Sequence, residues 1–374
     1  MRRLGIVGLC VTLIVTATGM VRAAEEERPK VQLAILLDTS GSMSGLIDQA
    51  RTQLWRIVNE FATAKKDGQP PVLQVALYEY GKSSIPASEG YLRMIAPLTD
   101  DLDKVSEELF KLTTNGGSEY CGMVIQASVE GLKWSPSDKE LKAIFIAGNE
   151  PFTQGSVDYR TACKAAITKG IIVNTIHCGS EQQGIDGKWK DGAMLADGSY
   201  MNIDQNRAIA HIAAPQDKEI ARLGAELNKT YVPYGGAGTV GAARQMEQDA
   251  NARKRASAGS YVQRMVAKSS AQYRNVSWDL VDAVKEGKVD LKELKKDELP
   301  ENMQKMTPEE RKAYLEQNAK KRAEIQEKIR KLNEERRDYV AAERKKQAKP
   351  GEKTLDQAVI GSVREQAESK GYKF

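Results

Sequence analysis

The sequence has little histidine and no long internal apolar run. Only His177 and His211 occur in 374 residues, which nearly excludes a zinc site built from several imidazoles. No internal run reaches the roughly 18 apolar residues of a membrane-spanning helix, and the mean hydropathy is -0.51, so a multispanning membrane protein is excluded. The hydrophobic content of 41% in turn excludes a chain that is disordered throughout.

Charge is divided unevenly along the chain. Lys and Arg are in excess by three in residues 1–23, Asp and Glu by six in 24–240, and Lys and Arg by eight in 241–374. In the last block the basic residues are interleaved with acids and aromatic residues are sparse, which is a poor fit to a nucleic-acid-binding surface. We therefore expect an acidic body and a basic tail, with no nucleic-acid partner.

The N-terminus has the pattern of a secretory signal peptide. Arg2 and Arg3 precede an apolar stretch over 4–20, and small or apolar residues before Ala23 fit cleavage after that residue. We predict a signal peptide at 1–23, export to the periplasm or the extracellular side of the envelope, and no integral span after cleavage; the alternative is an uncleaved membrane anchor. Export leaves three cysteines in an oxidising compartment, namely Cys121, Cys163 and Cys178. Three cysteines can form at most one intramolecular disulfide.

The body alternates apolar runs with amphipathic segments. Runs of this kind are typical of strands buried on both faces, and the alternation predicts an α/β fold with a doubly wound, mostly parallel sheet over 31–235. The expected strands are 31–37, 72–80, 141–147, 171–177 and 231–234, and the expected helices are 46–64, 102–112, 123–134, 157–169 and 217–228. In such folds ligands bind at the carboxyl ends of the strands.

The loop after the first strand is the most informative part of the chain. It places Asp38, Ser40 and Ser42 at alternate positions, with Gly41 allowing a tight turn. A carboxylate and two hydroxyls are hard oxygen ligands suited to Mg²⁺, Mn²⁺ or Ca²⁺. The alternative interpretation is that these residues cap the following helix.

This D-x-S-x-S loop resembles the metal-ion-dependent adhesion site (MIDAS) of the von Willebrand factor A (vWA) family over residues 31–235. The resemblance implies six strands, five parallel and one antiparallel edge strand near 91–95. It also implies that the two serines bind the metal directly and that Asp38 acts through water or hydrogen bonds. The second family loop supplies a threonine, and here Ser118 or the carboxylate of Glu119 takes its place.

The third loop departs from the family pattern. Gly148 stands where the family has an aspartate, and Asn149 or Glu150 takes that role if the loop shifts by one residue. Together with the predicted signal peptide, the resemblance implies an exported, non-enzymatic, protein-binding module. It binds Mg²⁺ (or Mn²⁺/Ca²⁺), and an acidic side chain of a protein partner completes the coordination. The alternative is a structural envelope scaffold with a degenerate metal site, in which the C-terminal arm carries the interaction.

The remaining sequence predicts a hairpin and a helical arm. Residues 187–203 contain an Asp-Gly turn and are interpreted as a hairpin. Residues 236–374 are predicted to be helical and coiled-coil-like, with a helix start at Thr307 and Pro308. An approximate seam of Leu315, Ile325, Ile329, Leu332 and Tyr339, interrupted by Arg322 and Arg336, offers a surface for self-association.

Overall fold

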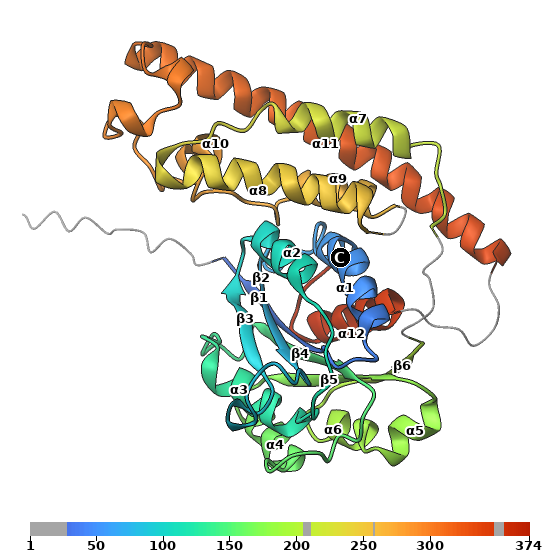
Figure 1. Cartoon of the computed structure of the whole chain (residues 1–374). Coiled ribbons are helices and arrows are strands. Elements are labelled where there is room, and N and C mark those ends of the chain that lie inside the picture. Colours follow the sequence, from blue (N-terminus) through green and yellow to red (C-terminus); the bar gives the residue numbers. More distant parts are fainter. Residues whose placement is uncertain (1–27, 205–210, 257–258, 348–354) are drawn as a thin grey trace, which may run out of the picture.

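The computed structural model describes residues 28–204, 211–256, 259–347 and 355–374, so the expected signal peptide at 1–23 lies outside the described residues. A six-stranded sheet with the order β3-β2-β1-β4-β5-β6 forms the centre of the body (Figure 1). Its strands are β1 (Lys30–Asp38), β2 (Val72–Tyr80), β3 (Arg93–Thr99), β4 (Leu141–Gly148), β5 (Ile172–Cys178) and β6 (Tyr200–Ile203). Only β3 is antiparallel to its neighbour, which confirms the predicted mostly parallel sheet and its antiparallel edge strand.

The register of the parallel strands brings their carboxyl ends to one edge of the sheet. Asp38 at the end of β1 pairs with Tyr80 at the end of β2, and Gly148 at the end of β4 pairs with His177 of β5. The central strands are buried on both faces, as continuous apolar runs require. The loops that follow these strands therefore lie side by side at this edge.

Helices cover both faces of the sheet. Those of the body are α1 (Ser44–Glu60), α2 (Leu102–Lys111), α3 (Cys121–Gly131), α4 (Tyr159–Thr168), α5 (Glu181–Asp186) and α6 (Trp189–Met194), with a short 3-10 helix η1 (Ala87–Glu89). One core joins the sheet to α1 and α2, and a second joins it to α3, α4 and α6. Cys121, Cys163 and Cys178 are buried free thiols in these layers.

Two sequence predictions at the end of the body are wrong. The sixth strand is Tyr200–Ile203, parallel to β5, and not 231–234. Residues 187–203 form no hairpin, because Trp189–Met194 is helical and its tryptophan is buried in the core. Pro233 makes only an isolated bridge to Asp279, and a proline has no N–H to donate to a sheet ladder. Val232 packs instead in a core of the arm.

The helical arm follows the body and lies above α1 and α2 in Figure 1. Its helices are α7 (Asp217–Asn228), α8 (Gly235–Lys254), α9 (Ser260–Lys268), α10 (Leu280–Lys285) and α11 (Pro308–Gln347), with short 3-10 helices η2 (Lys296–Glu298) and η3 (Glu301–Met303). Thr307 Oγ1 accepts from the Glu310 N–H at 3.2 Å, and Glu310 Oε2 accepts from the Thr307 N–H at 2.8 Å, which confirms the predicted helix start. No described helix is long and apolar enough to span a bilayer.

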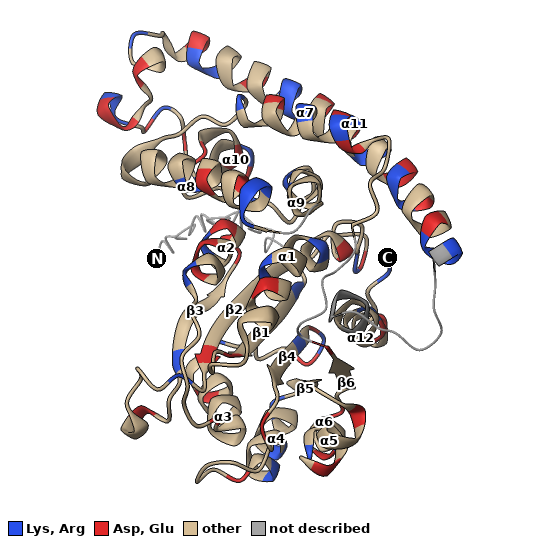
Figure 2. Cartoon of the chain, turned by 45° about the vertical axis from the view of Figure 1, so that its right-hand side comes forward, with Lys and Arg blue, Asp and Glu red and all other residues tan. Residues whose placement is uncertain are grey.

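The predicted seam of α11 packs inside this chain. Ile325 and Ile329 are buried against residues of α7 and α9. The two arginines that interrupt the seam are buried ion-pair partners: Arg322 Nη1 donates to Asp279 at 2.6 Å and to Asp282 at 2.7 Å, and Arg336 Nε donates to Asp217 at 2.6 Å. Basic and acidic residues alternate along most of α11 (Figure 2).

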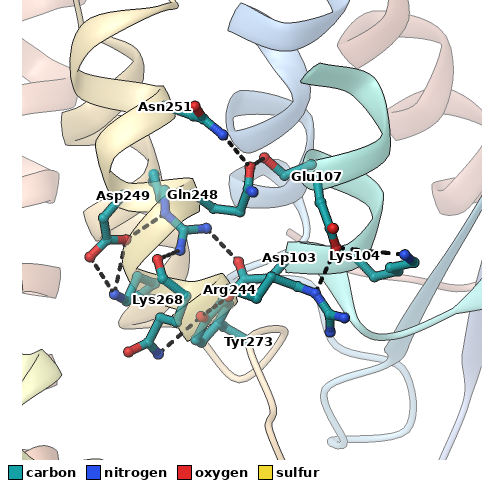
Figure 3. Close-up of polar contacts among 12 residues, drawn as sticks. Asp103, Lys104, Glu107, Arg244, Gln248, Asp249, Asn251, Lys268 and Tyr273 are labelled. Atoms are coloured by element: carbon teal, nitrogen blue, oxygen red, sulfur yellow. Dashed lines mark hydrogen bonds and ion pairs between the residues drawn. The ribbon is translucent and has the colours of Figure 1, made fainter. Parts of the chain in front are cut away.

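A buried polar network joins the arm to the body (Figure 3). Arg264 of α9 has a side chain with no exposed surface, and it donates to Asp103 of α2 at 2.5 Å and to Asp249 of α8 at 2.6 Å. Lys268 donates to both oxygens of Asp249 at 3.1 Å, and the Tyr273 hydroxyl donates to Asp103 at 2.5 Å. Two acids and two bases thus neutralise one another between arm and body.

The last helix, α12 (Leu355–Ser369), returns to the sheet domain. Val359, Val363 and Ala367 belong to the same core as α1. The chain end is fixed beside the first strand, since Lys373 forms a bridge with Lys65 and the Tyr372 hydroxyl donates to the Lys30 carbonyl at 2.7 Å. The segment 236–374 predicted as one helical region therefore contains a helix that lies on the body.

Candidate metal centre

The loop after β1 is held by its own aspartate. Asp38 is fully buried, and its Oδ1 accepts from the Ser40 N–H at 2.7 Å, while the Thr39 N–H donates to the Tyr80 carbonyl at 2.8 Å. The N-cap of α1 is Met43, and no side-chain hydrogen bond caps this helix. The alternative interpretation of Asp38, Ser40 and Ser42 as helix caps is therefore wrong, and their side chains are available to the edge of the sheet.

The second loop brings a carboxyl group to Asp38. Its backbone approaches the loop after β2 so closely that a Cβ on Gly117 would lie 2.7 Å from the Gly81 carbonyl oxygen. This path turns Glu119, which is 3% exposed, toward Asp38, and the two carboxyl groups interact. Ser118, the other candidate of this loop, is half-buried and makes no hydrogen bond to Asp38 among the described residues. Of the two candidates in this loop, Glu119 is the one whose side chain meets Asp38.

The third loop has no room for the aspartate of the family pattern. A Cβ on Gly148 would lie 2.5 Å from the Tyr80 hydroxyl and 3.2 Å from Asp38 Oδ2. Tyr80 is fixed there because its hydroxyl donates to the Ala147 carbonyl at 2.9 Å. The side chain of Tyr80, at the end of β2, therefore occupies the space that an aspartate at position 148 would need. The sequence analysis did not identify Tyr80 as a residue of this site. The pairing of β1 with β2 is the signal that could have done so, since it makes the ends of these strands neighbours.

The two substitutes proposed for this loop behave differently. Asn149 Nδ2 donates to Ser42 Oγ at 3.4 Å, so this side chain faces the first loop. Glu150 touches Glu119 through its backbone, its N–H donating to Glu119 Oε2 at 3.3 Å, while its own exposed carboxylate accepts from Gln154 at 3.2 Å. The structure brings Asn149 to the site and leaves the Glu150 carboxylate outside it.

The gathered oxygens lack partners. Asp38 Oδ2, Ser40 Oγ and Asn149 Oδ1 are buried and have no hydrogen-bond partner among the described residues. Burial, followed by the neighbouring Glu119 carboxyl, raises the pKa of Asp38 well above its ordinary value, and burial raises the pKa of Glu119. Unsatisfied buried oxygens and two adjacent acids are costly unless a proton or a cation neutralises them.

This donor set fits a hard divalent cation. All of its atoms are carboxylate, hydroxyl or amide oxygens, which suit Mg²⁺, Mn²⁺ or Ca²⁺ better than softer metals. The described residues contain no group of three or more His, Cys, Asp or Glu side chains able to hold a metal ion. Any ion here would thus rest on two acids, with Ser40, Ser42 and Asn149 supplying neutral oxygens.

A pocket of about 700 Å³ opens beside this centre. His177 of β5 and Trp189 of α6 line it together with Asn149 and Glu150. The His177 ring nitrogen Nε2 lies 3.3 Å from the Asn149 carbonyl oxygen, and burial lowers the pKa of His177. His177 is therefore a neutral hydrogen-bonding residue that supports the third loop.

Comparison with known proteins finds a family match within the body. Residues 32–187 match the family model of the von Willebrand factor type A domain, and the sheet with its flanking helices has the vWA fold. No curated protein matches the chain.

Solved structures with this fold are distant in sequence. BatB from Bacteroides thetaiotaomicron is 18% identical, with 46% of this chain and 90% of that chain covered and a TM-score of 0.36. The SpRpn10 VWA domain is 16% identical, with 48% and 100% covered and a TM-score of 0.35. Proximal thread matrix protein 1 from the mussel byssus, with a zinc-occupied MIDAS motif, is 12% identical, with 47% and 42% covered and a TM-score of 0.36.

Proposed function

We propose that this protein is an exported, metal-dependent protein-binding module. Its divalent cation, Mg²⁺ or else Mn²⁺ or Ca²⁺, is held by the loop of Asp38, Ser40 and Ser42, with Glu119 as the second acid in place of the family's third-loop aspartate. The observation that carries this proposal is a set of buried oxygens without a hydrogen-bond partner among the described residues, Asp38 Oδ2, Ser40 Oγ and Asn149 Oδ1, beside the carboxyl group of Glu119.

The chemistry of such a site is adhesive. Neutral hydroxyl and amide oxygens leave much of the cation's charge uncompensated, so an acidic side chain of a partner protein completes the coordination. Members of the vWA class typically mediate protein–protein interaction or metal-dependent adhesion, and no catalytic group is required. The scaffold with a degenerate metal site is less favoured, because the acid missing at Gly148 has a replacement at Glu119.

The metal is tested by thermal unfolding with Mg²⁺ titrated into chain freed of metal with EDTA. At a hundredfold excess over the dissociation constant, a single bound ion stabilises the folded state by about 2.7 kcal/mol. Ser40→Ala should lose this stabilisation, whereas Ser156→Ala, which changes an exposed serine outside the site, should keep it.

Glu119→Gln gives a distinguishing signature. Because burial raises the pKa of Glu119 in the folded chain, the carboxylate destabilises the metal-free fold at neutral pH, and the neutral amide relieves this cost. The variant should melt above the wild type in EDTA and gain nothing from Mg²⁺. Equal Mg²⁺ shifts in wild type, Ser40→Ala and Glu119→Gln would refute the proposed site.

Export and partner binding have their own tests. N-terminal sequencing of the protein from its native envelope should find Ala24 as the first residue if residues 1–23 are removed. An intact Met1 would favour the membrane anchor.

Affinity capture from the same envelope, with and without EDTA, should find partners that are lost on chelation. Partners that survive chelation would favour the scaffold.

A further inference from the structure

A second candidate site lies away from the metal centre, where the arm and α12 meet the sheet domain. It is a cleft of about 480 Å³, lined by residues of α1, α9, α11 and α12. The cleft is large enough for a small-molecule ligand, since such sites commonly measure about 300–1,000 Å³. Its walls come from the body, the arm and the C-terminal helix, which are remote from one another in sequence.

The lining of this cleft is strongly basic. Glu60 is the single acid among its lining residues. Five arginines line it: Arg56, Arg336, Arg337, Arg344 and Arg364. Arg364 pairs with Glu60, and Arg336 pairs with Asp217, which is not a lining residue of the cleft. Arg337 and Arg344 have no ion pair among the described residues, so the lining keeps excess positive charge. This local excess differs from the rest of α11, where the two signs alternate.

Polar groups without partners line the same cleft. Ser260 and Gln53 are each 2% exposed, and Ser260 Oγ and Gln53 Oε1 have no partner among the described residues. Arg364 Nε is likewise a shielded donor without a partner.

The first turn of α9 adds a further attraction for negative charge. Ser260 is the first residue of this nine-residue helix, and Gly259, Ser260 and Gln263 all line the cleft. The first N–H groups of a helix have no partner within it, and its dipole favours an anion there. The donors of the cleft thus comprise guanidinium, hydroxyl and amide groups from several directions.

We propose that this cleft binds a phosphate-type anion, either the free ion or the phosphate group of a small molecule. Arginine forks match the oxygens of phosphate, and converging donors suit a tetrahedral anion with several oxygens and more than one charge. A single carboxylate has only two oxygens and one charge, and it would leave most of this lining unsatisfied. Because the ligand contacts three parts of the chain, its binding stabilises the docking of the arm and α12 on the body.

The test is isothermal titration of the full chain with inorganic phosphate and with glycerol phosphate, in EDTA and at constant ionic strength set with chloride. The variant is Arg337→Gln with Arg344→Gln. The matched control is Arg330→Gln with Lys331→Gln, which removes two positive charges from exposed positions of the same helix outside the cleft. Ser260→Ala tests the buried hydroxyl.

We expect saturable binding at millimolar concentration or below in wild type and control, weakened at least tenfold in the double arginine variant and severalfold in Ser260→Ala. Tighter binding of glycerol phosphate would identify a phosphomonoester as the ligand, and equal binding would identify the free ion. Absence of saturable binding overturns the proposal, and so does equal weakening in variant and control, which is a general charge effect. Binding of a glutamate-rich peptide without binding of phosphate also overturns it, in favour of an acidic protein partner.

Discussion

Replacing Arg264 by methionine should lower the free energy of unfolding by about 3–5 kcal/mol, the usual cost of breaking a buried ion pair. The guanidinium has no exposed surface, donates to the Gln245 carbonyl at 3.0 Å as well as to its two acids, and lies 4.5 Å above the Trp55 ring. Methionine restores part of the packing and leaves the charges of Asp103 and Asp249 without their shared partner.

The two acids do not lose equally. Asp249 keeps Lys268 and accepts from Asn228 Nδ2 at 2.6 Å, whereas among the described residues Asp103 keeps only the Tyr273 hydroxyl. The uncompensated charge therefore falls mainly on Asp103. Adding Asp103→Asn to Arg264→Met should recover about 1–3 kcal/mol, the coupling typical of residues in one network.

The assay is urea denaturation followed by far-ultraviolet circular dichroism, which reports mainly on helices, and by tryptophan fluorescence, to which Trp55 of the body contributes. Both transitions should move together, because the network connects α9 and α8 of the arm to α1 and α2 of the body. Arg222→Met, which breaks an exposed pair with Glu219 on α7, is the control and should leave the stability nearly unchanged, because solvent screens such pairs. A loss below about 1 kcal/mol for Arg264→Met, or no recovery in the double variant, would refute the reasoning.

Three further changes test other parts of the structure. Burial lowers the pKa of Lys268 to about 8. Between this pH and the ordinary lysine pKa, the unfolded chain therefore binds a proton that the folded chain lacks. As the pH rises through this range, Lys268 should increase the free energy of unfolding by up to about 1.4 kcal/mol per pH unit. Denaturation series between pH 8 and 9.5 should therefore show a flatter slope for Lys268→Met than for wild type. Gly148→Ala should lower the free energy of unfolding by about 1–3 kcal/mol, because the added methyl group would clash with the Tyr80 hydroxyl. Thermal unfolding should show part of this loss recovered when Tyr80→Phe is added. A single variant as stable as the wild type would contradict the close approach of Tyr80 to Gly148. Arg322→Gln should lower the free energy of unfolding by about 3 kcal/mol or more, because Asp279 and Asp282 lose the cation that they share. Limited proteolysis should then cut α11 faster than in the wild type. Unchanged cleavage would contradict a structural role for Arg322.

The central sheet could be predicted from sequence because its strands are buried on both faces and read as continuous apolar runs. The sixth strand could not, since Tyr200–Ile203 is short and alternates between buried and half-buried residues. Residues 231–234 have a stronger local pattern, and only the missing N–H of Pro233 and the packing of Val232 in the arm argue against a strand. Tertiary contacts decided between two segments that looked alike.

The arm shows a similar limit. Arg322 and Arg336 read as defects in an apolar seam, yet both are about 5% exposed and hold the arm together. Their partners Asp279 and Asp217 are far away in sequence, so periodicity along α11 carries no signal of them. At the candidate metal centre, sequence located the three loops. It could not decide between Ser118 and Glu119, because the side chain that faces Asp38 depends on how closely Gly117 approaches Gly81.

The return of the C-terminus gives the arm two attachments to the body. The arm leaves the sheet domain after β6, and the chain comes back through α12, whose apolar side chains share a core with α1. A pull on the arm is therefore opposed both at the Arg264 network and at α12, and the arm cannot swing away as a lever on one hinge. A force applied by a partner at the end of α11 would be divided between the Arg264 network and α12, which lie on the same face of the sheet.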